Sequence, residues 1–268
     1  MQQSGGGNLE LTPQGFKGLF KKLVSGQAAR LGFTLAEVLI TLGIIGVVAA
    51  MTMPTLIVNY QKKVTVVKLK KEYSELNSVL KQSVADYGST STWADWPVDA
   101  YNRDGLTEKW VNKYVIPYTK VLKLDAKSIL PTVVGLDGIS GAANAAYSIV
   151  KEDGIIWGFM PNINYGTGVR IFVYINNPKN RDAILGKDVF VFVIYSSDKD
   201  IVKAWGQGHT RDDLMAAGSM PNSNTANELP NAGSCNKEGF YFSYARAGAA
   251  CSALIMLDGW QIKSDYPW

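Results

Sequence analysis

The hydrophobic positions of this chain follow three successive patterns, and each pattern predicts a different kind of element. The first is an unbroken apolar run over 33–53. It holds about twenty residues, which at about 1.5 Å per helical residue match a hydrocarbon core of roughly 30 Å. Glu37 is the only charged residue in this run, and no other charge follows before Asn59. The run therefore predicts one membrane-spanning helix.

The second pattern places apolar residues at spacings of three and four, which is typical of one face of an amphipathic helix. It forms one stripe in a segment otherwise rich in lysine and glutamate, made of Val66, Leu69, Tyr73, Leu76, Leu80, Val84 and Tyr87. Gly88 and Ser89 end the stripe. Together the two patterns predict one helix of about fifty residues over 33–88, whose second half packs on a sheet.

The third pattern alternates apolar and polar positions and predicts β-strands. The dipeptide Asp153-Gly154 marks a tight turn, so the first pair of strands should form an antiparallel hairpin. The predicted strands occupy 147–160, with the turn inside it, 169–175 and 188–195.

The remaining segments carry turn-forming residues and predict mostly irregular structure. The stretch 90–146 mixes tryptophan and proline, and we expect loops with one short helix over 107–115. The stretch 216–236, rich in Asn, Ser, Gly and Pro, predicts a long surface loop, and 248–257 predicts a short closing helix.

Glu37 is the residue that a plain membrane anchor does not explain. A carboxylate buried in lipid costs about 2.5–3.5 kcal/mol even on the lenient insertion scale, so Glu37 needs a partner or a place close to an interface. No cation follows within the span. The amino group created by a cut just before Phe33 would lie one helical turn away, in the same or a neighbouring molecule. The alternative is a signal anchor in which Glu37 reaches headgroup level.

The start of the apolar run resembles the class III signal of type IV prepilins and type II secretion pseudopilins. The residues that carry the resemblance are Gly32-Phe33-Thr34-Leu35-Ala36-Glu37-Val38-Leu39-Ile40, and apolar residues follow them. The resemblance implies that a prepilin peptidase cuts between Gly32 and Phe33, that the Phe33 amino group is N-methylated, and that Glu37 assists assembly. Pro54 resembles the proline at which pilin helices bend or melt, and proline weakens any helix interior. Residues 1–32 then form a cleaved leader.

Charge supports this layout only in part. The leader holds four of the 27 basic residues and one of the 23 acidic residues, so the mature chain would have a net charge near +1. That balance argues against nucleic acid as the main partner. The flank after the span is rich in lysine, so a count of positive charges alone would place the C-terminal part on the inner side of the membrane. Long domains, however, translocate largely regardless of charge. The processing motif therefore decides the orientation.

Cys235 and Cys251 are the only two cysteines, sixteen positions apart. In an exported domain an even cysteine count predicts a disulfide, and the resemblance implies a C-terminal disulfide loop. Two buried thiols are the alternative. Zinc does not fit, because His209 is the only histidine and the spacing matches no ligand pattern.

A calcium site is a weaker hypothesis. The segment 169–190 resembles a segment found in pseudopilin-like proteins. In those proteins an oxygen-rich connection between two strands could suit calcium, because calcium takes six to eight oxygen ligands. This chain departs from that segment, since Tyr174 replaces the acid and Asn177 the glycine. The remaining candidate ligands are Asn176, Asp182 and Asp188, and a turn stabilised by Asn and Asp hydrogen bonds is the alternative.

Catalysis finds little support in the sequence. His209 has Asp212, Asp213 and Ser219 nearby, but no Gly-x-Ser-x-Gly motif or paired-ligand motif accompanies them. The seven tryptophans are scattered, so an aromatic core or filament contacts explain them better than carbohydrate stacking. We therefore expect a structural protein without a cofactor.

The sequence as a whole predicts an α+β, pilin-like protein, with a leader over 1–32, a long helix over 33–88 and a soluble head over 89–268. The resemblance implies a minor pilin or pseudopilin held by a single pass in a bacterial inner membrane, its head periplasmic or exported in a filament. Its partners would be the membrane, other pilin or pseudopilin subunits, the prepilin peptidase and a pilus assembly platform. The alternative is a monomeric, signal-anchored extracytoplasmic binding protein.

Overall fold

The structure is a computed structural model, and it describes residues 33–99, 102–125, 130–139, 145–162, 167–178, 180–197, 199–216, 234–237 and 247–268. The chain divides into two compact units, Met1–Leu56 and Ile57–Trp268. The predicted leader, with Gly32, lies outside the described residues, as does nearly all of the predicted loop over 216–236.

The long helix predicted from the first two patterns is present as α2, Leu35–Tyr87, which is 53 residues long. It ends where the sequence indicated, because Gly88 adopts a left-handed conformation with φ of +79° and donates its N–H to the Val84 carbonyl. Helix α2 continues through Pro54 without interruption. The expected weak point is therefore not a break in this structure, and opening of the helix there in a filament stays a prediction.

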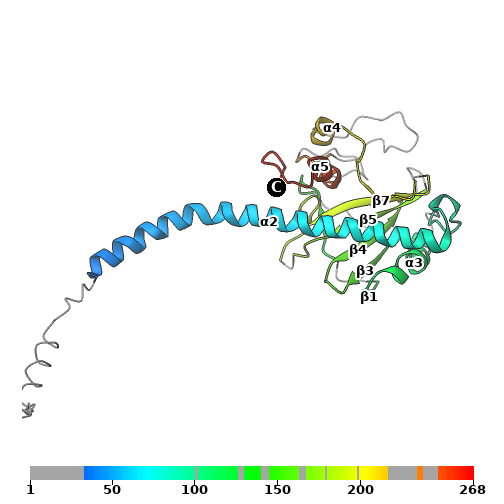
Figure 1. The fold of residues 1–268 in the computed structure, drawn as a ribbon, viewed down its shortest axis with the longest axis horizontal. Coiled ribbons are helices and arrows are strands. Elements are labelled where there is room, and N and C mark those ends of the chain that lie inside the picture. Colours follow the sequence, from blue (N-terminus) through cyan, green and yellow to red (C-terminus); the bar gives the residue numbers. More distant parts are fainter. Residues whose placement is uncertain are drawn as a thin grey trace, which may run out of the picture. The chain divides into compact units, whose positions relative to one another are not determined.

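An antiparallel sheet forms the centre of the head, confirming the α+β fold class (Figure 1). Its strand order is β1-β3-β4-β5-β7-β8, and each neighbouring pair is antiparallel. The strands are β1 Val121–Leu124, β3 Tyr147–Lys151, β4 Ile156–Pro161, β5 Gly168–Tyr174, β7 Val189–Tyr195 and β8 Lys203–Ala204. The predicted hairpin is confirmed as β3 and β4, with Gly154 at φ +81° in the turn.

The central strands differ from the expected half-exposed alternation. Strands β5 and β7 are buried at all seven of their positions. Both faces of the sheet centre are therefore covered, which explains why their sequences are nearly continuous apolar runs. The ring of Tyr73 on α2 stacks on Phe192 of β7 at 5.6 Å between centroids, so the predicted stripe does pack on the sheet (Figure 1).

The segment 90–146 holds more regular structure than predicted. Its helix α3, Arg103–Tyr114, begins four residues earlier than expected, and the short helices η1, Thr90–Thr92, and η2, Ile116–Tyr118, flank it. Strand β1 was missed because it is four residues long and largely exposed. Strand β2, Val133–Val134, was missed because two residues show no period, and it pairs in parallel with β6, Ala183–Ile184.

Two short helices lie towards the C-terminus of the chain. They are α4, Arg211–Met215, and α5, Cys251–Leu257, the closing helix that the sequence predicted. Helix α5 is joined to the sheet by the Ser252 hydroxyl, which donates to the Val191 carbonyl of β7 at 2.6 Å. The tryptophans mostly serve the core: five are buried, namely Trp93, Trp96, Trp110, Trp157 and Trp205.

Candidate functional site

The N-terminal end of α2 carries the predicted processing and assembly residues. Its apolar side chains are exposed, with Phe33 85 % exposed, and α2 is long and apolar enough by length and composition to cross a membrane. This is the one such helix among the described residues. Gly32, on the other side of the predicted cut, is not described.

Glu37 has a hydrogen-bond partner within its own chain, Thr34. Its Oε2 accepts hydrogen bonds from the Thr34 N–H at 2.8 Å and the Thr34 hydroxyl at 2.9 Å. The Thr34 hydroxyl in turn accepts from the Glu37 N–H at 3.2 Å. This reciprocal arrangement is a capping box, which satisfies free N–H groups at a helix start. The Thr-x-x-Glu spacing at 34–37 was the signal that could have predicted it.

A buried and strongly charged site of the head joins α2 to the first hairpin. Lys151 of β3 is 3 % exposed, and its Nζ lies 2.7 Å from Glu72 Oε2, 2.7 Å from Glu75 Oε2 and 3.5 Å from Asp153 Oδ2. Glu72 is 1 % exposed and also accepts from Trp157 Nε1 at 2.8 Å. Burial raises the pKa of Glu72, while the hydrogen bonds from Lys151 and Trp157 act in the opposite direction.

These three acids are the group among the described residues that lies close enough together to hold a metal ion. The Lys151 ammonium, however, already contacts all three carboxylates, and an ammonium in that place excludes a second cation. The arrangement therefore works as a buried ion-pair network that fixes α2 on the hairpin. One feature of the sequence indicated this network. Glu72 lies three residues after Leu69, so its carboxylate is on the apolar face that packs on the sheet.

The disulfide between Cys235 and Cys251 is confirmed, and both residues are fully buried. It ties the segment 234–237 to the first residue of α5, with 4.6 Å between the two Cα atoms. The Cys235 N–H also donates to the Leu214 carbonyl of α4. The bridge thus holds both short C-terminal helices together and indicates an oxidising compartment for the head.

Replacing both cysteines by serine should lower the free energy of unfolding of the head by about 3 kcal/mol, because the bridge closes a loop of about 15 residues. Urea unfolding followed by tryptophan fluorescence measures the change. Peptide mapping without reductant should recover the two cysteine peptides as one linked species. Quantitative alkylation of both thiols in unreduced, denatured protein would contradict the assignment.

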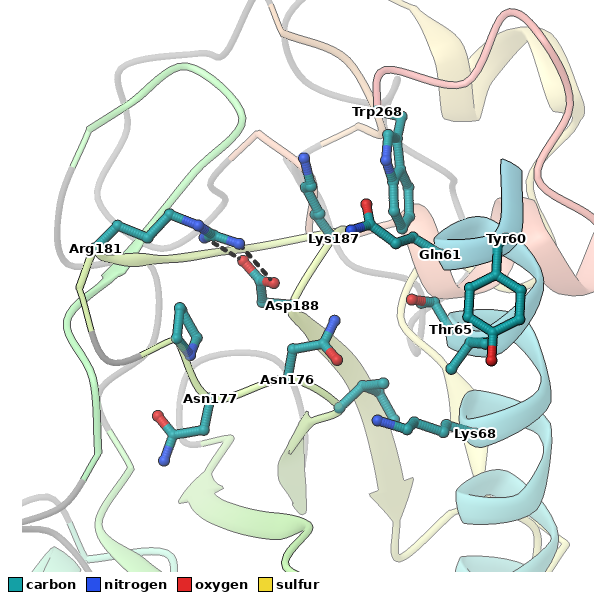
Figure 2. A pocket seen from close by; sticks show the side chains of 13 residues that line it. Tyr60, Gln61, Thr65, Lys68, Asn176, Asn177, Arg181, Lys187, Asp188 and Trp268 are labelled. Atoms are coloured by element: carbon teal, nitrogen blue, oxygen red, sulfur yellow. Dashed lines mark hydrogen bonds and ion pairs between the residues drawn. The ribbon is translucent and has the colours of Figure 1, made fainter. Parts of the chain in front are cut away.

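The calcium candidates do not form a cation site. Figure 2 shows the Arg181 guanidinium against the Asp188 carboxylate, with Nη1–Oδ2 at 2.6 Å and Nη2–Oδ1 at 3.0 Å. Asp188 Oδ2 also accepts from the Ile184 N–H at 2.9 Å. Both oxygens are thus occupied by protein donors, and Asp182 is exposed and does not line the pocket that Asn176 and Asp188 share. These residues therefore do not fit calcium.

Among the polar residues near His209, the structure gives Asp213 a local structural role. Asp213 forms a capping box with Thr210 at the start of α4, accepting from the Thr210 hydroxyl at 2.6 Å. His209 lies in the turn before that helix, and Ser219 lies outside the described residues. In the described part of the chain, no nucleophile and base come together around His209.

A family model described as "Family of unknown function (DUF6613)" matches residues 55–268. The match begins directly after Pro54 and so includes the second part of α2, the sheet and the disulfide, but not the apolar segment. No curated protein and no solved structure matches the chain.

Proposed function

We propose that this chain, a member of the DUF6613 family, is a pilin-like structural subunit, anchored by α2 and assembled with further subunits into a filament. One observation carries the proposal. The prepilin-type motif at 32–40 lies at the start of a helix that is first apolar and exposed, and then packs its second part on an antiparallel sheet. An anchor serving only as a tether needs no such motif and no such continuation into a core.

The disulfide adds support, since it fits a head exported into an oxidising compartment. The partners we propose are a prepilin peptidase, an assembly platform and other pilin-like subunits. The role is mechanical and needs no catalytic group. A type IV pilus and a type II secretion pseudopilus both use subunits of this design, and the size of the head favours a minor subunit.

The capping box favours a second candidate, a signal-anchored binding protein that stays monomeric. Because Thr34 supplies two hydrogen bonds to Glu37 within one chain, the carboxylate has a local role without any neighbouring subunit. The two functions differ in what the Glu37 charge does. In a filament it neutralises the Phe33 amino group of an adjacent subunit, and in a monomer it only caps α2.

The charge and the cap can be separated by substitution. Glu37→Gln keeps an N3 side chain that can complete the capping box but removes the charge, whereas Thr34→Ala removes the cap and keeps the charge. If Glu37 serves assembly, Glu37→Gln and Glu37→Val should abolish crosslinked multimers in membranes while membrane levels and cleavage stay normal. Thr34→Ala should retain the multimers.

Crosslinking of intact membranes followed by immunoblotting measures these outcomes. Multimers at parental levels in both Glu37 variants would refute the assembly role. Loss in Thr34→Ala together with Glu37→Val, but not in Glu37→Gln, would assign Glu37 to helix capping rather than to charge pairing. Absence of crosslinked multimers in the parent itself would favour the monomeric protein.

A further inference from the structure

An open pocket of about 480 Å³ lies between α2 and the connection that follows β5 (Figure 2). Helix α2 contributes Gln61, Thr65 and Lys68, and the connection contributes Asn176 and Asn177. Figure 2 shows the side chains of Gln61, Thr65 and Asn176 pointing into the same space. The volume falls in the range of small-ligand sites, roughly 300–1,000 Å³.

The polar groups of this pocket are largely free. Within the described part of the chain, hydrogen bonds and ion pairs are absent from the side chains of Gln61, Thr65, Lys68, Asn176 and Asn177. Thr65 is 3 % exposed and lines the pocket from α2. Gln61 and Asn177 are exposed and Lys68 and Asn176 are half-buried, so these side chains are free to turn towards a ligand in the pocket.

The charge of the pocket selects an anion. Three basic residues line it, namely Lys68, Arg181 and Lys187, against one acid, Asp188. Asp188 is neutralised by Arg181 and by the Ile184 N–H, so it does not offset the two lysines. The Lys187 Nζ lies 5.2 Å from the centre of the Trp268 ring, which orders the ammonium without neutralising it.

The pattern of donors favours phosphate over a simpler anion. Two ammonium groups, three side-chain amides and a hydroxyl exceed what one carboxylate can accept, whereas a phosphate group offers several strong acceptor oxygens, and lysine binds it as a point charge. The amides also suit hydroxyl groups attached to that phosphate, because each amide both donates and accepts.

Position along the chain indicates where such a phosphate would come from. Tyr60 and Gln61 follow the charge-free run by only a few residues, about 10 Å along a helix that leaves the hydrocarbon core near Met53. Lys62 lies with its Nζ 6.0 Å from the Trp268 ring. Lysines beside tryptophan and tyrosine are characteristic of the headgroup level of a membrane.

We propose that this pocket binds the phosphate group of an anionic glycerophospholipid headgroup at the membrane surface. The inference rests on the proposed function only in placing the apolar part of α2 in a membrane, and it holds for a membrane-held subunit before assembly or for a monomer. The bound headgroup fixes the head against the bilayer through α2 and the β5–β6 connection. Free phosphate is the other source of the same chemistry, and the test separates the two.

The experiment uses the full chain in non-ionic detergent micelles, titrated with phosphatidylglycerol or with phosphatidylcholine and followed by native mass spectrometry. The parent should bind phosphatidylglycerol more tightly. Lys68→Gln and Lys187→Gln should each weaken that binding about fivefold, the effect of about one lysine at a lipid surface. Asn177→Ala, at an exposed position, should weaken it about threefold through the lost hydrogen bond.

Lys70→Gln is the matched control, because Lys70 is an exposed lysine on the same helix that does not line the pocket. It should change the affinity less than twofold, and each variant should unfold at the parental temperature in lipid-free micelles. Equal affinity for the two lipids would contradict binding in this pocket. So would a loss of affinity in Lys70→Gln as large as that in Lys68→Gln. Displacement of the lipid by inorganic phosphate would overturn the lipid assignment.

This outcome is independent of filament assembly, since the micelles hold unassembled chains. If the titrations show no selective binding of phosphatidylglycerol in the pocket, the Glu37 crosslinking result is unaffected. Multimers at parental levels in both Glu37 variants, together with intact phosphatidylglycerol binding, would remove the assembly role and keep the lipid site. Flotation of the full chain with phosphatidylcholine vesicles tests anchoring alone.

Discussion

Replacing Lys151 by methionine should lower the free energy of unfolding by about 3–5 kcal/mol, among the largest effects expected from any single substitution in the head. Methionine fills a similar volume, but it leaves Glu72 as a buried carboxylate without the ammonium that lies 2.7 Å away. The remaining neighbours of that carboxylate are Trp157 Nε1 at 2.8 Å and the exposed Lys71 ammonium at 3.8 Å. Urea unfolding of the full chain in micelles, followed by tryptophan fluorescence, measures the loss.

A double variant shows whether the loss comes from an uncompensated charge. Combining Lys151→Met with Glu72→Gln removes both charges and keeps an acceptor for Trp157, so it should recover most of the lost stability. Lys120→Met is the matched control, because Lys120 pairs with Glu152 only at 3.9 Å and at an exposed site. It should change stability by less than about 0.5 kcal/mol. A loss below about 1 kcal/mol in Lys151→Met would contradict a stabilising network.

Gly32→Leu should abolish processing of the chain, the largest effect expected at the N-terminus. The resemblance to prepilins requires a small residue before the scissile bond, and a leucine side chain there would block the cut. The uncut product should be heavier by about 3.5 kDa, at roughly 110 Da for each of the leader residues 1–32. Intact mass spectrometry of membrane fractions measures the difference.

Gly43→Leu is the control for a glycine-to-leucine change in the apolar segment. A Cβ added at Gly43 meets no atom within 4 Å, so this variant should be cut as the parent is. A mature parent chain that begins at any residue other than Phe33 would end the prepilin interpretation. It would leave an anchored head whose lipid pocket can still be tested.

Several elements followed directly from local sequence. The 3–4 spacing from Val66 to Tyr87 and the glycine at 88 predicted α2 to within a few residues, because an amphipathic period and a left-handed stop are both local properties. The Asp153-Gly154 turn predicted the β3–β4 hairpin for the same reason. The cysteine pair was correct because a chain with two cysteines offers one intramolecular bridge.

Other features depended on contacts between distant parts of the chain. Glu72 and Lys151 are 79 positions apart. The place of Glu72 on the apolar stripe indicated a buried carboxylate, but nothing near either residue indicated which cation it meets. The pairing of β2 with β6 joins two dipeptides about fifty residues apart, each too short to show a period. The Arg181–Asp188 pair replaced the predicted calcium ligation, because which cation a carboxylate meets depends on side-chain placement rather than on spacing.

The sequence by itself therefore determined the membrane-length segment, the long helix, the first hairpin and the disulfide, all of which depend on period, turn chemistry or count. The tertiary structure alone decided which charges are buried together, that both faces of the sheet centre are covered, and that Gln61, Thr65 and Lys68 share a pocket with Asn176 and Lys187. These features arise when the chain closes long loops. Their energies come from desolvation and complementary charge, which local sequence does not encode.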